Sequence, residues 1–75
     1  MDEILEILND IKPGVDYENA TDLIDAHRLD SLSIIALVSD LEDAFDITIP
    51  TVEIIPANFN SAAALWAMVQ RLQEE

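Results

Sequence analysis

Residues 29–45 decide the fold, and their sequence is Leu-Asp-Ser-Leu-Ser-Ile-Ile-Ala-Leu-Val-Ser-Asp-Leu-Glu-Asp-Ala-Phe. Apolar residues recur there at the helical spacings of three and four, and they are Leu32, Ile35, Leu37, Val38, Leu41 and Phe45. Asp30 and Ser31 stand at the start, and either side chain can accept a hydrogen bond from an unpaired N–H of a first helical turn. We therefore predict an amphipathic helix that begins at this pair and ends near Phe45.

Ser31 lies where a helix start presents unpaired N–H groups and the positive end of the helix dipole. A phosphate attached to the serine oxygen would be stabilised there. A serine at such a position usually only caps the helix, so the position alone does not assign a modification. Whether Ser31 is only a cap or a modification site has to be inferred from the residues on either side of it.

Those residues resemble the acyl carrier proteins over nearly the whole chain. The match rests on Asp30-Ser31-Leu32 before an acidic amphipathic helix, and on Phe45-Asp46-Ile47-Thr48-Ile49-Pro50 after it. The resemblance implies a 4′-phosphopantetheine arm on Ser31, supplied by coenzyme A, whose thiol holds cargo as a thioester. It also implies that Asp30 helps to orient the metal-bound phosphate donor of the modifying enzyme. Leu32 would be an exposed contact beside the arm, with Ile35 able to take the inward place.

The resemblance leaves the cargo open. Many carriers have a glycine shortly before the Asp-Ser pair, whereas this chain has Asp25-Ala26-His27-Arg28-Leu29. That segment, together with residues 45–50, is similar also to D-alanyl and peptidyl carriers. Ile34, Ala36 and Ser39 stand where fatty-acid carriers more often have polar groups. Fatty-acid or polyketide, D-alanyl and peptidyl cargo therefore all stay possible.

The charge of the chain limits its partners. Sixteen acids stand against three bases, which gives a net charge of −13. Nucleic-acid binding is nearly excluded because so few bases cannot neutralise phosphates, and anionic membranes are disfavoured for the same reason. The balance favours basic protein partners. We expect a monomer that meets a phosphopantetheinyl transferase and acyl- or aminoacyl-transferring enzymes with basic docking surfaces.

A docking surface is predicted at the C-terminal end of the helix of residues 31–45. Asp40, Glu42 and Asp43 gather there, followed by Asp46, although the helix dipole disfavours negative charge at this end. Acids at the unfavourable end of a helix dipole, with no basic residue among them to offset the charge, are typical of a functional surface. We predict that Asp40, Glu42, Asp43, Glu53 and the apolar Ile34 contact partners. The alternatives are a merely solvated acidic face and, for Ile34, a place in the core.

The remaining residues predict an all-α fold, a small antiparallel bundle of three main helices plus one short helix. A first helix spans about Asp2 to Ile11 and stops at Pro13-Gly14. Residues 14–29 lack a sustained period and predict a long ordered loop, with a helical turn near residues 22–26. We expect three apolar side chains to pin this loop to the core, namely those of Tyr17, Leu23 and Ile24.

The second half of the chain predicts a connector and two helices. Residues 46–50 predict an extended connector with buried isoleucines, because a lone strand is not stable. A short helix or turn lies within residues 52–59, interrupted or begun at Pro56. The last helix begins at Asn60-Ser61, with Asn60 as the expected cap. Its apolar stripe contains Ala62, Leu65, Met68, Val69 and Leu72, with Trp66 at the edge.

Composition bounds what such a domain can do. The chain has 75 residues, of which 51% are hydrophobic, and no cysteine, so we expect a single carrier domain over residues 1–75 without disulfide or thiolate chemistry. No stretch has the length of a membrane span, and we expect a cytoplasmic protein. Adjacent carboxylates such as Glu42 and Asp43 do not face each other on a helix, so no catalytic pair is predicted. We expect a carrier and not an enzyme, with an unmodified acidic helical adaptor as the alternative from another class.

Overall fold

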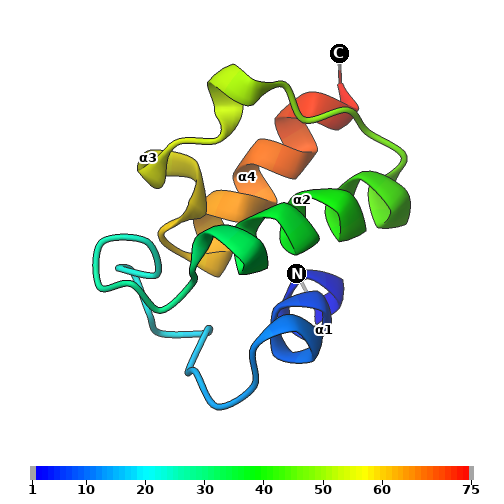
Figure 1. The fold of residues 1–75 in the computed structure, drawn as a ribbon. Helices are drawn as coiled ribbons and strands as arrows, with labels where there is room; N and C mark the ends of the chain where they lie inside the picture. Colours follow the sequence, from blue (N-terminus) through cyan, green and yellow to red (C-terminus); the bar gives the residue numbers. More distant parts are fainter. Residues whose placement is uncertain (1, 75) are drawn as a thin grey trace.

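The computed structural model describes residues 2–74 and contains four α-helices within them (Figure 1). They are α1 (Asp2–Ile11), α2 (Ser31–Phe45), α3 (Pro56–Phe59) and α4 (Ala62–Gln73), with a 3₁₀ turn, η1 (Thr51–Glu53), before α3. None of these residues forms a strand. No helix of the described chain is both long and apolar enough to cross a membrane.

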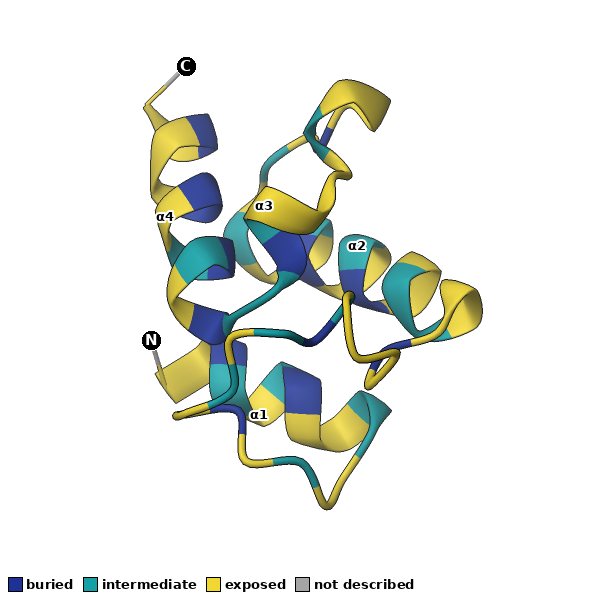
Figure 2. Cartoon of the chain, turned by 90° about the vertical axis from the view of Figure 1, so that its left-hand side faces the viewer, coloured by how far each residue is buried: buried dark blue, intermediate teal, exposed yellow. Residues whose placement is uncertain are grey.

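The core lies among α1, α2 and α4, whose buried faces turn toward one another (Figure 2). Each helix supplies residues at helical spacing, such as Ile4 and Leu8 from α1, Leu37 and Leu41 from α2, and the predicted stripe of α4. No polar or charged residue of the described chain is buried. Burial of apolar side chains therefore holds the bundle together, as the hydrophobic pattern predicted.

The long loop between α1 and α2 is pinned as predicted. Tyr17 and Leu23 are buried in the core, and Ile24 packs against it while partly exposed. The Tyr17 hydroxyl donates to the carbonyl of Lys12 at 2.6 Å, which closes the first bend of the loop. The predicted turn is also present, because the N–H of Ala26 donates to the carbonyl of Asp22 at 2.8 Å.

The predicted cap of the last helix is wrong. Ser61 caps α4, since its hydroxyl accepts from the N–H of Ala64 at 3.0 Å. The side-chain oxygen of Asn60 accepts instead from the N–H groups of Ile24 and Asp25, at 2.9 and 3.1 Å. Both residues are competent caps, but the amide nitrogen of Asn60 also donates to the Asp25 carboxylate at 3.2 Å, so its donor and its acceptor both contact the long loop. Asn60 therefore ties the long loop to the junction of α3 and α4.

The connector after α2 agrees with its prediction. Residues 47–50 form no regular secondary structure, Pro50 is extended, Ile49 is buried and Ile47 is partly buried. The N–H of Ile49 donates to the Glu42 carboxylate at 2.8 Å, so a side chain of α2 accepts a hydrogen bond from the connector in the absence of a neighbouring strand among the described residues. Pro56 begins α3, where its missing N–H costs nothing.

The charge imbalance leads to a prediction about stability. With sixteen acids and three bases, few acids can be paired, and within residues 2–74 the structure shows the pairs Arg28–Asp22 and Arg71–Glu53. Self-repulsion should therefore oppose folding, and salt should screen it. We expect the melting temperature to rise between about 0.01 and 0.1 M salt, and to rise further with divalent cations, in thermal unfolding followed by circular dichroism. A flat or falling trend would show that the acids are already compensated in the fold.

Candidate functional site

Ser31 is the first residue of α2 and its side chain is exposed. The helix is capped by the residue before it, because the Asp30 carboxylate accepts from the N–H of Ser33 at 2.8 Å. The Ser31 hydroxyl makes no hydrogen bond to any other residue in the range 2–74 and is available to a partner. The predicted helix start is confirmed, with the capping role assigned to Asp30.

Two first-turn N–H groups of α2 stay open beside this hydroxyl. The N–H of Ser33 is taken by the Asp30 carboxylate, and that of Ile34 donates to the Asp30 carbonyl at 3.0 Å. The N–H groups of Ser31 and Leu32 have no acceptor within the described part of the chain. Open donors and the positive end of the dipole make this end of α2 suited to an anion covalently held at Ser31.

The Asp30 carboxyl stays ionised at this site. The N–H of Ser33, the hydroxyl of Ser33 and the positive charge of Lys12 all hold the pKa of Asp30 below its usual value. A fixed carboxylate next to a free hydroxyl is a place where a metal cation carried by a partner could sit.

Acid should therefore weaken the fold through two carboxyls. The guanidinium of Arg71 lowers the pKa of Glu53, as the Ser33 donors lower that of Asp30. A carboxyl with a lowered pKa in the folded state favours the fold above its unfolded pKa, near 4, and loses that effect as the pH falls through the folded-state value. We expect Asp30→Asn and Glu53→Gln each to reduce the loss of stability between about pH 5 and pH 3, measured by urea unfolding.

The matched control for the acid experiment is Glu6→Gln on α1. Glu6 is exposed and makes no hydrogen bond or ion pair within residues 2–74, so this change removes one negative charge and no contact. Its pH profile should run parallel to that of the unchanged protein. Parallel profiles for all three variants would mean that neither Asp30 nor Glu53 links protonation to folding.

The apolar side chains after Ser31 differ from the prediction in which of them are exposed and which are buried. Leu32 is exposed, as the family resemblance implied, but Ile35 is also 66% exposed, so Ile35 does not take the inward place that the sequence left open to it. Ile34 is partly buried instead and packs against the core. The reason is helical geometry, because Ile34 shares a face with Leu37, Val38 and Leu41, whereas Ile35 is turned by about 100° from it.

The segment of η1 and α3 adds further exposed apolar groups that the sequence analysis did not single out. They belong to Val52, Ile54 and Ile55. A signal was present, because three apolar residues among four consecutive positions cannot all face inward from a short helix. Ile54 and Ile55 also border an apolar pocket of about 60 Å³ between this segment, the long loop and α2, which is lined by Ile24, Ile34, Ile54, Ile55, Pro56 and Phe59.

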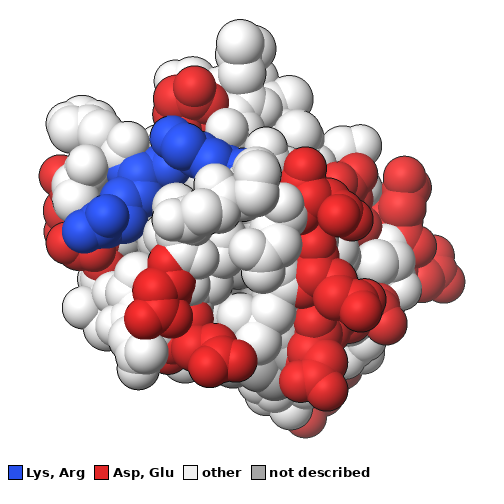
Figure 3. Space-filling model, turned by 90° about the horizontal axis from the view of Figure 1, so that it is seen from below, with Lys and Arg blue, Asp and Glu red and all other residues white. Residues whose placement is uncertain are grey.

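The predicted docking acids fall into two groups. Asp40 and Asp43 are exposed on α2, and three residues of spacing place them on one face. Glu42 is partly buried because it accepts from the Ile49 N–H, and Glu53 receives bonds of 2.7 and 2.9 Å from Arg71. The structure thus gives Glu42 and Glu53 partners within the chain and leaves Asp40 and Asp43 open. Seen from below, acids form a band along one side of the molecule, and the bases lie toward the other side with further acids beside them (Figure 3).

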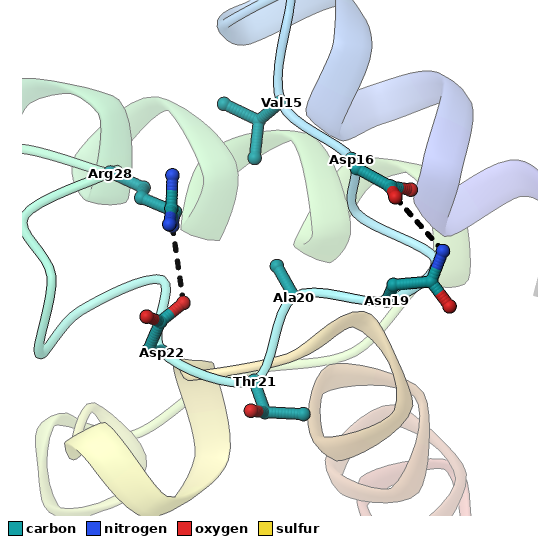
Figure 4. A pocket seen from close by; sticks show the side chains of 7 residues that line it. All are labelled: Val15, Asp16, Asn19, Ala20, Thr21, Asp22 and Arg28. Atoms are coloured by element: carbon teal, nitrogen blue, oxygen red, sulfur yellow. Dashed lines mark hydrogen bonds and ion pairs between the residues drawn. The ribbon is translucent and has the colours of Figure 1, made fainter.

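A larger hollow of about 360 Å³ lies within the long loop (Figure 4). Four of its polar side chains pair with one another, since Arg28 donates to Asp22 at 3.1 Å and Asn19 donates to Asp16 at 2.8 Å. A single loop segment supplies every side chain that lines it, and none of the predicted site residues is among them. This hollow therefore adds nothing to the site at Ser31.

Comparison with known proteins identifies the class of protein that this fold and site define. Residues 2–69 match the family described as phosphopantetheine attachment site. The chain is 39% identical over 54 residues to a D-alanyl carrier protein of Lactococcus lactis subsp. lactis (strain IL1403), across 72% of this chain and 68% of that protein. The chain therefore belongs to the phosphopantetheine-binding carrier proteins.

Membership of this family confirms several predictions from the sequence. The protein is a carrier with the all-α fold of its family and not an enzyme, and its prosthetic group is 4′-phosphopantetheine. Carriers of this kind interact with transferases and with the enzymes of a synthetic pathway. The alternative of an unmodified acidic adaptor has no support left.

Proposed function

We propose that Ser31 bears the 4′-phosphopantetheine arm. The observation that carries this assignment is the free, exposed hydroxyl at the first residue of α2, beside open N–H groups. Ser61 also stands at a helix start, but its hydroxyl is partly buried and occupied by the N–H of Ala64. Capping by Asp30 keeps the Ser31 oxygen available, and the residues present fit the group that the family carries.

The chain's own residues would hold the arm by its phosphate. The N–H groups of Ser31 and Leu32 can donate to a phosphate oxygen there, and the helix dipole adds to the attraction. Asp30 holds the helix start in place and offers a carboxylate to the metal of an incoming donor. When bound, the arm supplies a thiol that carries cargo as a thioester.

An aminoacyl cargo is the candidate that we favour. The support is the similarity to a D-alanyl carrier protein, together with the apolar Ile34 where fatty-acid carriers more often have polar groups. Fatty-acyl, polyketide and peptidyl cargo are the alternatives. Incubating the arm-bearing protein with a D-alanine-activating ligase, ATP and D-alanine should add one alanyl group by mass. An equal gain with a malonyl transferase and malonyl-coenzyme A would point to fatty-acid or polyketide synthesis instead.

We propose that partners dock on α2. Asp40 and Asp43 would meet basic side chains, and the exposed Leu32 and Ile35 would supply the apolar contact beside Ser31. Ile34, Glu42 and Glu53, with their contacts inside the chain, would shape this surface more than touch the partner. The partners are a phosphopantetheinyl transferase and cargo-transferring enzymes, met in the cytoplasm by a monomeric carrier.

The direct test is incubation of the protein with coenzyme A and a broad-specificity phosphopantetheinyl transferase. We expect the intact mass to rise by one phosphopantetheine group, and peptide mapping to place that mass on the fragment that contains Ser31. A mass gain on a fragment with Ser61 and without Ser31 would overturn the assignment.

A further inference from the structure

The apolar pocket beside α2 lies within one helical turn of the attachment serine. Ile34, which lines it, follows Ser31 by three residues, so it shares a face with Ser31 at a rise of about 4.5 Å. The pocket measures about 60 Å³, whereas an apolar cavity known to bind benzene measures roughly 150 Å³. At this size it admits a methyl or ethyl group and not an extended hydrocarbon chain.

One wall of the pocket is fixed by Asn60. Ile24 belongs to the turn whose N–H groups, those of Ile24 and Asp25, donate to the Asn60 side chain at 2.9 and 3.1 Å. The Asn60 carbonyl also accepts from the N–H of Leu23 at 2.9 Å. Asn60 directly follows Phe59, which also lines the pocket. Its bonds therefore hold two walls at a set separation.

The other wall is fixed by Glu53. Its carboxylate accepts two bonds from the guanidinium of Arg71 on α4, at 2.7 and 2.9 Å. The amide of Asn58 on α3 donates to the Glu53 carbonyl and carboxylate at 2.8 and 3.0 Å. Ile54 and Ile55 lie between these two anchors while still partly exposed. These polar contacts tie the segment to α3 and α4.

We propose that Asn60 and the Glu53–Arg71 pair are positioning residues that hold this pocket narrow, and so restrict the carrier to short cargo. A long chain could enter only if the turn at Ile24 or the segment at Ile54 and Ile55 moved outward, which would break one set of these bonds. Short cargo needs no such movement. The proposal rests on attachment at Ser31 and adds the residues that set the limit on cargo size.

The test compares two cargo lengths on the same protein. Acetyl- and octanoyl-phosphopantetheine are transferred from the corresponding coenzyme A esters, and the intact mass first reports whether loading occurred. Failure to load would count against the proposed function, and the melting temperatures of loaded protein then report on the pocket. For the unchanged protein we expect the two loaded forms to melt at nearly the same temperature. A buried octanoyl chain would raise melting by about 5 °C or more.

Removing the contacts of either Asn60 or Glu53 should create a difference in melting temperature between the two loaded forms. We expect octanoyl-loaded Asn60→Ala and Glu53→Gln to melt several degrees above their acetyl-loaded forms, even where both forms melt lower than the unchanged protein. A residue that only stabilises the fold would lower the two forms equally. Asn9→Ala and Glu6→Gln on α1 are the matched controls, because they make the same chemical changes at residues that do not line the pocket. Asn9→Ala also removes a hydrogen bond, the one of 2.9 Å that the Asn9 amide donates to the Leu5 carbonyl. An octanoyl-dependent rise in the unchanged protein, or none in both anchor variants, would overturn the proposal.

Discussion

Ser31→Ala should abolish arm attachment and leave the fold almost unchanged. The Ser31 hydroxyl is exposed and makes no hydrogen bond within residues 2–74, and the cap of α2 comes from Asp30. Surface substitutions that remove no contact usually change the free energy of unfolding by less than about 0.5 kcal/mol. Mass spectrometry after incubation with coenzyme A and a transferase should show no gain, while the urea unfolding curve stays close to that of the unchanged protein.

Ser61→Ala is the matched control for this result, and it should behave in the opposite way. Its hydroxyl caps α4 at 3.0 Å, so its loss should cost about 1 kcal/mol of unfolding free energy. Attachment should proceed as before. The two variants thus separate modification from stability. We expect Ser31→Ala to lose only arm attachment and Ser61→Ala to lose only stability. Phosphopantetheine attachment to the Ser31→Ala protein would contradict the assignment of the site.

Sequence pattern alone located the helices that carry the function. α1, α2 and α4 are long enough for their apolar residues to repeat over several turns, and each begins or ends at residues with strong local preferences, such as Asp30 or Pro13-Gly14. The turn near residues 22–26 and the start of α3 at Pro56 were predicted on the same local grounds. The residues that place Ser31 at a helix start are therefore local in the chain.

What the sequence could not supply were contacts between distant residues. Asn60 looked like a helix cap, because nothing near it in the chain shows that its partners are Ile24 and Asp25, some 35 residues away. Glu53 looked like a free docking acid, but Arg71 on another helix takes both of its oxygens. Such pairings depend on how the elements pack, which a local period does not encode.

Reversal of Asp40 and Asp43 to lysine should slow association with the transferase by about tenfold at low salt. Both carboxylates are exposed on one face of α2 and make no hydrogen bond or ion pair among the described residues. Charges at the rim of an interface act mainly on the encounter of the partners and less on the lifetime of the complex. Glu42 is left unchanged, because its bond to the Ile49 N–H supports the connector. Association rates from stopped-flow measurements at two salt concentrations would report the effect.

Reversal of Glu6 and Asp10 on α1 provides the control for steering. Each double variant replaces two negative charges by two positive ones, so both shift the net charge from −13 to −9 (two changes of two charges each) and differ only in location. If α2 is the docking surface, the α1 variant should lose much less, and only the α2 variant should lose most of its salt dependence. Equal losses would mean that the field of the whole acidic molecule draws the partner in. In that case Leu32 and Ile35, and not the acids of α2, would have to provide the recognition beside Ser31.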